Sequence, residues 1–294
     1  MGVYRVDVCV LNDDYSGFTK LLSSHGLSIY LKIYSDIGIE NLLLDVGPSN
    51  YILKYNSESL NMDLSNIKSV ILSHRHYDHT GGLKYLMKTF NRFDKKLTII
   101  AHPWIFRPSI ILTESKQEFD KGMPYTREDF MRFKTNLILT KSPIQIAAST
   151  YYLGEIGNYY DLSRYKKDFH TILDDGELIP DDLPDDTGIA IKVEGLGLVV
   201  VSGCSHSGVV NIVKHASETL KENVYAVVGG FHMLKYDSND IVEAMNTLRE
   251  LGVEQIYTGH CTGFRAEKMF SEEFNDNYYK IHSGFKFSIK GEKP

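Results

Sequence analysis

The sequence predicts an α/β fold (α+β in some classification schemes), because apolar strand patterns alternate along the chain with amphipathic helical patterns. The strand patterns are rich in valine, isoleucine and leucine, and several of them run into a histidine. A unit of strand, polar loop and helix recurs clearly at residues 69–93 and 198–220. This recurrence is consistent with a sandwich of two similar halves, although no strong sequence repeat accompanies it.

The expected strands are short runs of aliphatic and β-branched residues, at residues 27–33, 41–44, 69–72, 198–201, 224–228 and 255–258. Helices are expected where apolar residues recur at a spacing of three and four residues. Three such stripes are Leu83, Leu86, Met87 and Phe90; Val209, Ile212, Val213 and Ala216; and Ile241, Ala244, Met245 and Leu248. We expect these stripes to face the core and assign them no chemistry.

Residues 103–167 differ from the rest of the chain, because prolines interrupt them and aromatic side chains are frequent. We expect a lid or insertion that covers the functional site, since loops set specificity on such scaffolds. The alternative is a helical excursion that buries its own aromatic side chains or forms an oligomer contact. The acidic run at residues 181–186 is expected to be a solvated loop.

The cluster most indicative of function follows the strand at 69–72: His74, His76, Asp78 and His79 lie within six residues, directly before Gly81 and Gly82. His74 and His76 point the same way in an extended segment, and neutral imidazoles suit zinc and related metals. Asp78 and His79 follow the turn and can face a second point. The cluster therefore predicts the start of two metal sites, about 3.5–4 Å apart in hydrolases of this kind. Histidines that only form hydrogen bonds are the alternative.

Three further strands also run into histidine, which can complete such sites. His206 follows the strand at 198–201, His260 follows the strand at 255–258, and His232 follows the strand at 224–228. We expect His206 and His260 to be metal ligands. His232 is expected to face the substrate or to support a ligand, rather than to bind metal itself.

Charge and composition limit the class of partner. The formal net charge is −6 and the pI is about 6.0, so no basic field attracts a nucleic acid. Three cysteines in 294 residues argue against a disulfide framework and for a reducing compartment. No run approaches the roughly 20 apolar residues of a membrane span, and the N-terminus lacks a signal-peptide core. We expect a soluble cytoplasmic protein, of open oligomeric state with a homodimer among the options.

The motif His74-x-His76-x-Asp78-His79 resembles the signature of the metallo-β-lactamase superfamily. The chain resembles in particular the dihydropterin-ribofuranosyl-aminobenzene-phosphate synthase-like branch of that superfamily. The matching segments are residues 25–28, 44–48, 73–83, 154–156, 203–208, 229–232 and 259–263. The resemblance implies an αββα sandwich of two mixed sheets flanked by helices, a single domain over residues 1–294, and a binuclear metal site at one edge of the sheets.

The resemblance also implies a role for each matching residue. His74, His76 and His206 would bind a first metal, and Asp78, His79 and His260 would bind a second one. Many relatives place an aspartate between the two metals, where this chain has Cys204. Either Cys204 is a thiolate ligand or His206 takes that space. In the family, a further histidine ligand is usual near residues 185–188, and this chain lacks it. Asp186 could bind the metal in its place, could orient a metal ligand, or could be a solvated loop acid.

Two more residues match the family outside the main motifs. Asp45 would support the site by hydrogen bonding. His25 would either line the substrate pocket or cap a turn before the strand at 27–33.

These observations predict a binuclear metal-dependent hydrolase. The cofactors would be two divalent ions, with zinc expected and manganese or iron as alternatives. These ions would generate hydroxide near neutral pH, and the hydroxide would attack a small, phosphorylated or cyclic ester. Asp78 would orient the nucleophile, and His232 would assist the leaving group. The helix that starts after Ser207 would favour an anionic group. Alternatives are a thioesterase or lactonase, a nuclease, and a non-catalytic metal-stabilised binding or regulatory protein.

Overall fold

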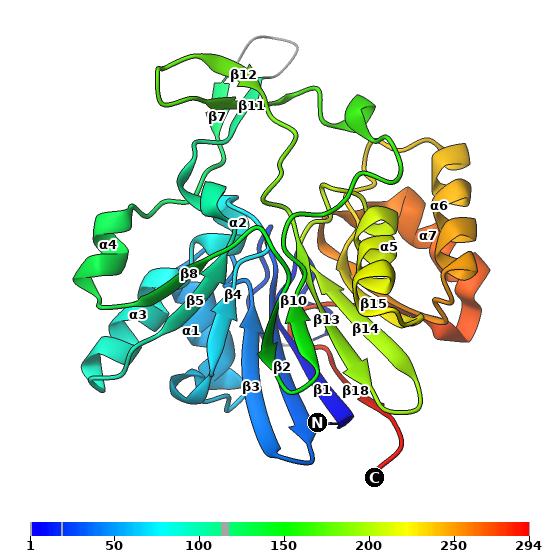
Figure 1. Cartoon of the computed structure of the whole chain (residues 1–294), viewed down its shortest axis with the longest axis horizontal. Helices are drawn as coiled ribbons and strands as arrows, with labels where there is room; N and C mark the ends of the chain where they lie inside the picture. The colour runs from blue at the N-terminus through cyan, green and yellow to red at the C-terminus, as the bar shows by residue number, and fades with distance from the viewer. Residues whose placement is uncertain (1, 19, 113–117, 294) are drawn as a thin grey trace.

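The computed structural model describes residues 2–18, 20–112 and 118–293, in which most strands join one large mixed sheet (Figure 1). The strand order is β17-β16-β15-β14-β13-β1-β2-β3-β4-β5-β8. One half of this sheet contains β1 (Val3–Asn12), β2 (Ser28–Ser35), β3 (Gly38–Leu44), β4 (Ser69–Ile71), β5 (Thr98–Ala101) and β8 (Asn136–Leu139). The other half contains β13 (Gly188–Val193), β14 (Gly197–Ser202), β15 (Val224–Gly230), β16 (Gln255–Gly259) and β17 (Tyr278–Lys280).

Three shorter strands extend this sheet. β18 (Lys286–Lys290) pairs with β1, and β10 (Thr150–Tyr152) pairs with both β13 and β9 (Ile144–Ala147). The two halves are continuous in hydrogen bonding, because β1 pairs with β13 at Val3 and Val193. The two sheets expected from the sequence are therefore joined into one.

Three apolar clusters show how the halves and the helices are layered. Leu42 and Leu44 of β3 belong to the central cluster, together with Val199 and Val201 of β14. Leu43, between them in sequence, points to the opposite face and packs with α1 (Asn50–Ser59) and α3 (Leu83–Arg92). A third cluster packs β14 to β16 against α5 (Val209–Leu220), α6 (Ser238–Glu250) and α7 (Phe264–Phe274). The layers run helix, sheet, sheet, helix, which confirms the predicted αββα sandwich.

Parallel pairing brings the functional loops together. β3, β4, β5 and β8 are parallel to one another, and so are β14, β15, β16 and β17. Ligand loops in open α/β sheets lie outside the carboxyl ends of parallel strands. The loops that follow β4, β14, β15 and β16 carry the predicted histidines at that edge, and the short helix α2 (Tyr77–Thr80) begins directly after His76.

The segment predicted as a lid divides between two structures. β8, β9 and β10 belong to the large sheet, and α4 (Arg127–Arg132) leads into β8. A separate small sheet, at the top of Figure 1, consists of β12 (Leu178–Pro180), β11 (Phe169–Ile172), β6 (Ile110–Leu112) and β7 (Glu118–Asp120). The small sheet thus uses residues beyond 167, and residues 113–117 of the predicted insertion lie outside the described part. Of the described helices, none has the length and apolarity to cross a membrane.

His102, which follows β5, predicts a pH-dependent contribution to stability. Its side chain is 1% exposed, and Nδ1 accepts a hydrogen bond from the Trp104 backbone N–H at 3.1 Å. Burial lowers the pKa of His102 from 6.5 to about 4. Because the unfolded chain binds this proton more readily, the stabilisation is complete above pH 6.5 and is lost as the pH falls towards 4.

We expect the free energy of unfolding to fall over that pH interval by on the order of 2 kcal/mol through this group. His102→Asn keeps an acceptor for the Trp104 N–H but removes the titration. Urea unfolding at a series of pH values gives the free energy of unfolding as a function of pH. Below pH 6.5 this free energy should fall less steeply with falling pH for the variant than for the wild type, and above pH 7 the two slopes should be equal. If the free energy of unfolding depends on pH in the same way for the variant and the wild type, His102 is not the group that titrates.

Candidate metal centre

Seven side chains with metal-binding atoms lie buried at the carboxyl edge of the strands: His74, His76, Asp78, His79, Cys204, His206 and His260. The backbone around them is unusual, since Asp45, Ser205, His232 and His260 all have positive φ, between 48° and 61°. Non-glycine residues adopt this left-handed conformation rarely, and such residues cluster at functional sites. The fold therefore holds strained backbone at the same edge where it gathers these side chains.

One group of donor atoms consists of Asp78, His79, Cys204 and His260, whose ligand atoms all lie within 4.8 Å of one another. His79 Nε2 and His260 Nε2 are 3.1 Å apart, and each is 3.1 Å from Cys204 Sγ. Asp78 Oδ2 lies 3.5 Å from His79 Nε2 and 3.7 Å from His260 Nε2. Four donors from three separate loops thus converge on one point.

A second group consists of His74, Cys204 and His206, again with ligand atoms within 4.8 Å. His76 joins it, because His76 Nδ1 is 3.0 Å from His74 Nε2. Both ring nitrogens of His206 are buried without a hydrogen-bond partner among the described residues. A buried imidazole with no partner is costly unless something satisfies it, and a bound cation would do so. The donor set therefore fits a metal, and Cys204 belongs to both groups.

The other four histidines each have an outer nitrogen held by a neighbouring side chain. His79 Nδ1 is 2.7 Å from Asp45 Oδ2, and the same carboxylate accepts hydrogen bonds from the Ser73 N–H and hydroxyl. Ser73 Oγ in turn lies 2.9 Å from His74 Nδ1. Such contacts fix the tautomer and the ring orientation of a ligand. Asp45 occupies the supporting position that the sequence predicts.

Two supporting residues were not identified from the sequence. Ser109 Oγ, at the base of the small sheet, lies 3.0 Å from His76 Nε2. Asp14 Oδ1 lies 2.7 Å from His260 Nδ1. Asp14 follows β1, so its place at the end of a strand was a usable signal, whereas Ser109 carries no motif. With these contacts, each of the four histidines directs its second nitrogen towards the shared cluster.

His25 lies at the margin of this site. Its Nδ1 is 2.9 Å from Asp14 Oδ2, its Nε2 is 3.4 Å from Asp78 Oδ2, and its ring packs 4.9 Å from that of His260. Burial alone would raise the pKa of Asp14, but hydrogen bonds from His25 and His260 outweigh it and hold that pKa below its usual value. This position agrees with the pocket-lining alternative for His25.

His232 lies beside the cluster rather than within its two main groups. Its ring centroid is 4.1 Å from that of His206 and 6.1 Å from Phe169 of the small sheet. The side chain is only partly buried, and its Nδ1 has no hydrogen-bond partner among the described residues. Its metal-binding atom also groups with Cys204 and Cys261. This geometry suits a residue that faces a bound substrate.

The electrostatics favour the neutral, metal-binding form of three histidines. Burial, followed by the charge of neighbouring imidazoles, holds the pKa values of His74, His76 and His206 well below the usual value. These rings are therefore neutral near pH 7, as a ligand must be. Burial raises the pKa of Cys204 well above its usual value, so metal binding by this thiol would release a proton.

The prediction that residues 181–186 form a solvated loop is wrong. Asp181 and Asp185 are buried and pair with the guanidinium of Arg75. The Arg75 side chain is fully buried, and the residue lies between His74 and His76 in the sequence. Asp185 also accepts a hydrogen bond from the Arg75 N–H at 2.8 Å. The sequence gives no sign of this burial, because the acids find their cation more than 100 residues away.

Asp186 is also buried, and it orients the loop that carries His206. Its Oδ2 accepts a hydrogen bond from the Ser207 N–H at 2.8 Å, and burial raises its pKa to about 6. The Gly208 N–H donates to the Ser205 carbonyl. These contacts use the Ser207 and Gly208 N–H groups, which precede the first turn of α5. The anion site expected at the start of this helix stays a prediction.

The metallo-β-lactamase fold defines the class of protein, and the comparisons agree. The structure of Tm1679, a metal-dependent hydrolase of the β-lactamase superfamily, matches with a TM-score of 0.81 and 29% identity, over 97% of this chain and 99% of that one. YhfI from Bacillus subtilis, a metallo-β-lactamase fold protein, shares the fold with a TM-score of 0.58 and 15% identity, over 97% of this chain and 100% of that one.

A curated relative identifies the family more narrowly. The 7,8-dihydropterin-6-methyl-4-(β-D-ribofuranosyl)-aminobenzene-5′-phosphate synthase of Methanocaldococcus jannaschii is 37% identical over 292 residues, which is 97% of this chain and 98% of the relative. This chain belongs to the family of that synthase, within the metallo-β-lactamase superfamily. The family model of the anti-Pycsar protein Apyc1 also matches residues 33–135.

Arg75 allows a direct test of whether its ion pairs with Asp181 and Asp185 stabilise the loop that carries His74 and His76. Arg75→Met leaves two buried carboxylates without their cation, so we expect the free energy of unfolding to fall by about 3–5 kcal/mol. The triple variant Arg75→Met, Asp181→Asn, Asp185→Asn should recover part of that loss. Urea denaturation measures both.

Arg5→Met is the matched control, because Arg5 forms an exposed ion pair with Asp7. Its effect should stay below about 1 kcal/mol. An Arg75→Met protein as stable as this control would show that the buried pairs do not hold the loop.

Proposed function

We propose that this chain is a hydrolase whose centre holds two divalent ions that share Cys204. His74, His76 and His206 would hold the first ion, and Asp78, His79 and His260 would hold the second. The observation that carries the proposal is the position of Cys204 Sγ, which belongs to both groups of converging donor atoms. In this reading Cys204 occupies the place of the aspartate found in many relatives, and His206 is a ligand as well.

The donor set favours zinc. Imidazole and thiolate are typical zinc ligands, whereas a thiolate is a poor ligand for magnesium or calcium. Manganese and iron are the alternatives. When bound, such ions supply Lewis acidity and lower the pKa of water to about 7.

The remaining roles fall to residues around the ions. Asp78 would orient the attacking water, and His232 would donate a proton to the leaving group through its partly exposed ring. Phe169 stacks on His76 at 5.6 Å between ring centroids and contacts His206 at 5.2 Å. Together with Ser109, it would exclude water from one side. We therefore propose that the small sheet, rather than the whole segment 103–167, is the cover of the site.

The substrate class is inferred from the relatives. Tm1679 is described as a metal-dependent hydrolase, and the M. jannaschii relative is named for a phosphorylated, pterin-containing product. We infer a small phosphorylated substrate, related to a pterin, whose ester bond is cleaved. The net charge of −6 disfavours nucleic acid as the substrate.

A second candidate is the activity named for the M. jannaschii relative itself. The 37% identity along nearly the whole chain favours it. The test uses a dihydropterin with a diphosphate leaving group on its 6-methyl carbon, together with ribofuranosyl-aminobenzene phosphate. Chromatography for the joined product and for released diphosphate distinguishes synthesis from hydrolysis.

The hydrolase proposal is tested with the zinc-loaded protein and a panel of phosphodiesters, lactones and thioesters. We expect turnover of a phosphodiester and a loss of at least about 100-fold in kcat for Asp78→Asn. Turnover of a lactone or thioester alone would move the assignment to those classes. Tight binding of a small molecule without any turnover would favour the non-catalytic alternative.

Cobalt substitution tests the role of Cys204 separately from turnover. A thiolate bound to Co²⁺ gives a charge-transfer band in the near ultraviolet. We expect this band in the wild type and in the control variant Cys9→Ser, and its loss in Cys204→Ser. A band that persists in Cys204→Ser would remove this residue from the metal site.

A further inference from the structure

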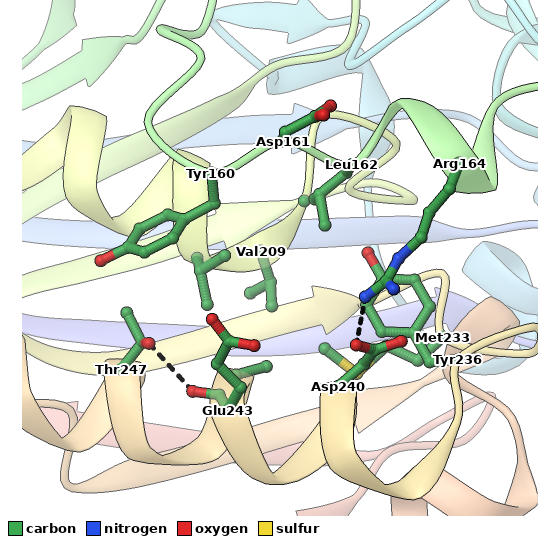
Figure 2. A pocket seen from close by; sticks show the side chains of 13 residues that line it. Tyr160, Asp161, Leu162, Arg164, Val209, Met233, Tyr236, Asp240, Glu243 and Thr247 are labelled. Carbon is green, nitrogen blue, oxygen red and sulfur yellow. Dashed lines mark hydrogen bonds and ion pairs between the residues drawn. The ribbon is translucent and has the colours of Figure 1, made fainter.

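A cavity beside the metal centre lies between the loop at residues 160–164 and helices α5 and α6 (Figure 2). Its volume is about 120 Å³. Val209, Val210, Met233 and Ala244 give it an apolar floor. A cavity of about this size holds a single six-membered ring. None of the proposed metal ligands lines it, although Met233 is the neighbour of His232 in sequence.

The roof of this cavity is held in place by specific contacts. Asn211 of α5 receives hydrogen bonds from the Tyr159 and Tyr160 N–H groups, and its own amide donates to the Tyr160 carbonyl. Leu162 approaches Gly208 so closely that a Cβ there would lie 2.1 Å from Leu162 Cδ1. Gly208 also has a φ of 90°, a conformation that favours glycine. The loop over the cavity is therefore fixed to α5 by specific contacts.

The polar groups of the cavity are mainly carboxylates. Figure 2 shows Asp240 and Glu243 pointing from α6 towards the loop. Asp240 Oδ1 pairs with Arg164, but Asp240 Oδ2 is buried and has no hydrogen-bond partner in the described ranges. The Glu243 carboxylate has no hydrogen bond or ion pair within the described part of the chain. Asp161 adds a third acid to the lining, so acceptors exceed donors.

Aromatic rings complete the environment. Tyr160 and Tyr236 line the cavity, and Tyr236 is fixed by stacking on Tyr165 at 3.9 Å between centroids. Aromatic faces attract cations, and carboxylates bind paired N–H donors in a bidentate manner. Arg164 also lines the cavity, but it is paired with Asp240, and three carboxylates outnumber its single positive charge. The apolar floor with these groups therefore favours a ring that carries positive charge.

We infer that this cavity is a binding site for a small aromatic amidine or amino-substituted nitrogen heterocycle. The ring would lie on the apolar floor between the tyrosines, and its N–H groups would donate to Glu243 and to the free oxygen of Asp240. This inference goes beyond the proposed hydrolysis and does not depend on it.

Calorimetric titration of the zinc-loaded full chain tests the site with benzamidine and with benzamide, its uncharged analogue. We expect benzamidine to bind at millimolar concentration and more tightly than benzamide. Glu243→Gln and Asp240→Asn should each weaken benzamidine binding by about tenfold without a matching effect on benzamide.

Glu250→Gln is the matched control, because Glu250 ends the same helix outside the cavity. It should leave benzamidine binding unchanged, and thermal unfolding of each variant confirms that the fold is intact. The inference is overturned if benzamidine does not bind, if benzamide binds equally well, or if Glu243→Gln and Asp240→Asn bind benzamidine as the control does.

Discussion

The burial of uncharged imidazoles at the edge where the two half-sheets meet is the constraint on which this structure depends. His74, His76 and His206 are removed from water, and neither nitrogen of His206 has a hydrogen-bond partner among the residues that the structure describes. Burying polar groups that have no hydrogen-bond partner costs free energy. A cation at their centre would convert that cost into binding energy, which explains why a fold would gather them.

The same constraint shapes the surroundings of the cluster. Asp45, Ser73, Asp14 and Ser109 each hold an outer nitrogen or a neighbouring group, so the inward nitrogens are fixed before any ion arrives. Arg75 then ties the metal loop to the acidic segment that leads from the small sheet into β13. Arg75 thereby connects the ligand loop to the small sheet, which we propose as the cover of the site. Ligands that are already in position cost less entropy when a metal binds.

The sequence was informative wherever local pattern determines structure. The apolar runs at residues 41–44 and 198–201 predicted strands. The histidines at the strand ends lie close together because parallel strands finish at one edge. The continuous hydrogen bonding between β1 and β13, by contrast, depends on a pairing almost 200 residues apart.

Long-range burial caused the main errors. Asp181 and Asp185 have the composition of a solvated loop, and only the buried Arg75 gives them another role. Asp186 likewise has the surroundings of a solvated acid in the sequence, but it is buried and accepts a hydrogen bond from the Ser207 N–H. Ser109 lies next to His76 because β6, which follows Ser109, pairs with the distant strand β11. No local pattern in the sequence predicts that pairing.

The most direct test of the central claim is the metal content of the full chain, purified without added metal or chelator and measured by elemental analysis. The account predicts about two equivalents of a divalent metal per chain, with zinc predominant. One equivalent would contradict the sharing of Cys204 between two sites, and no metal even after reconstitution would contradict the metal centre as a whole.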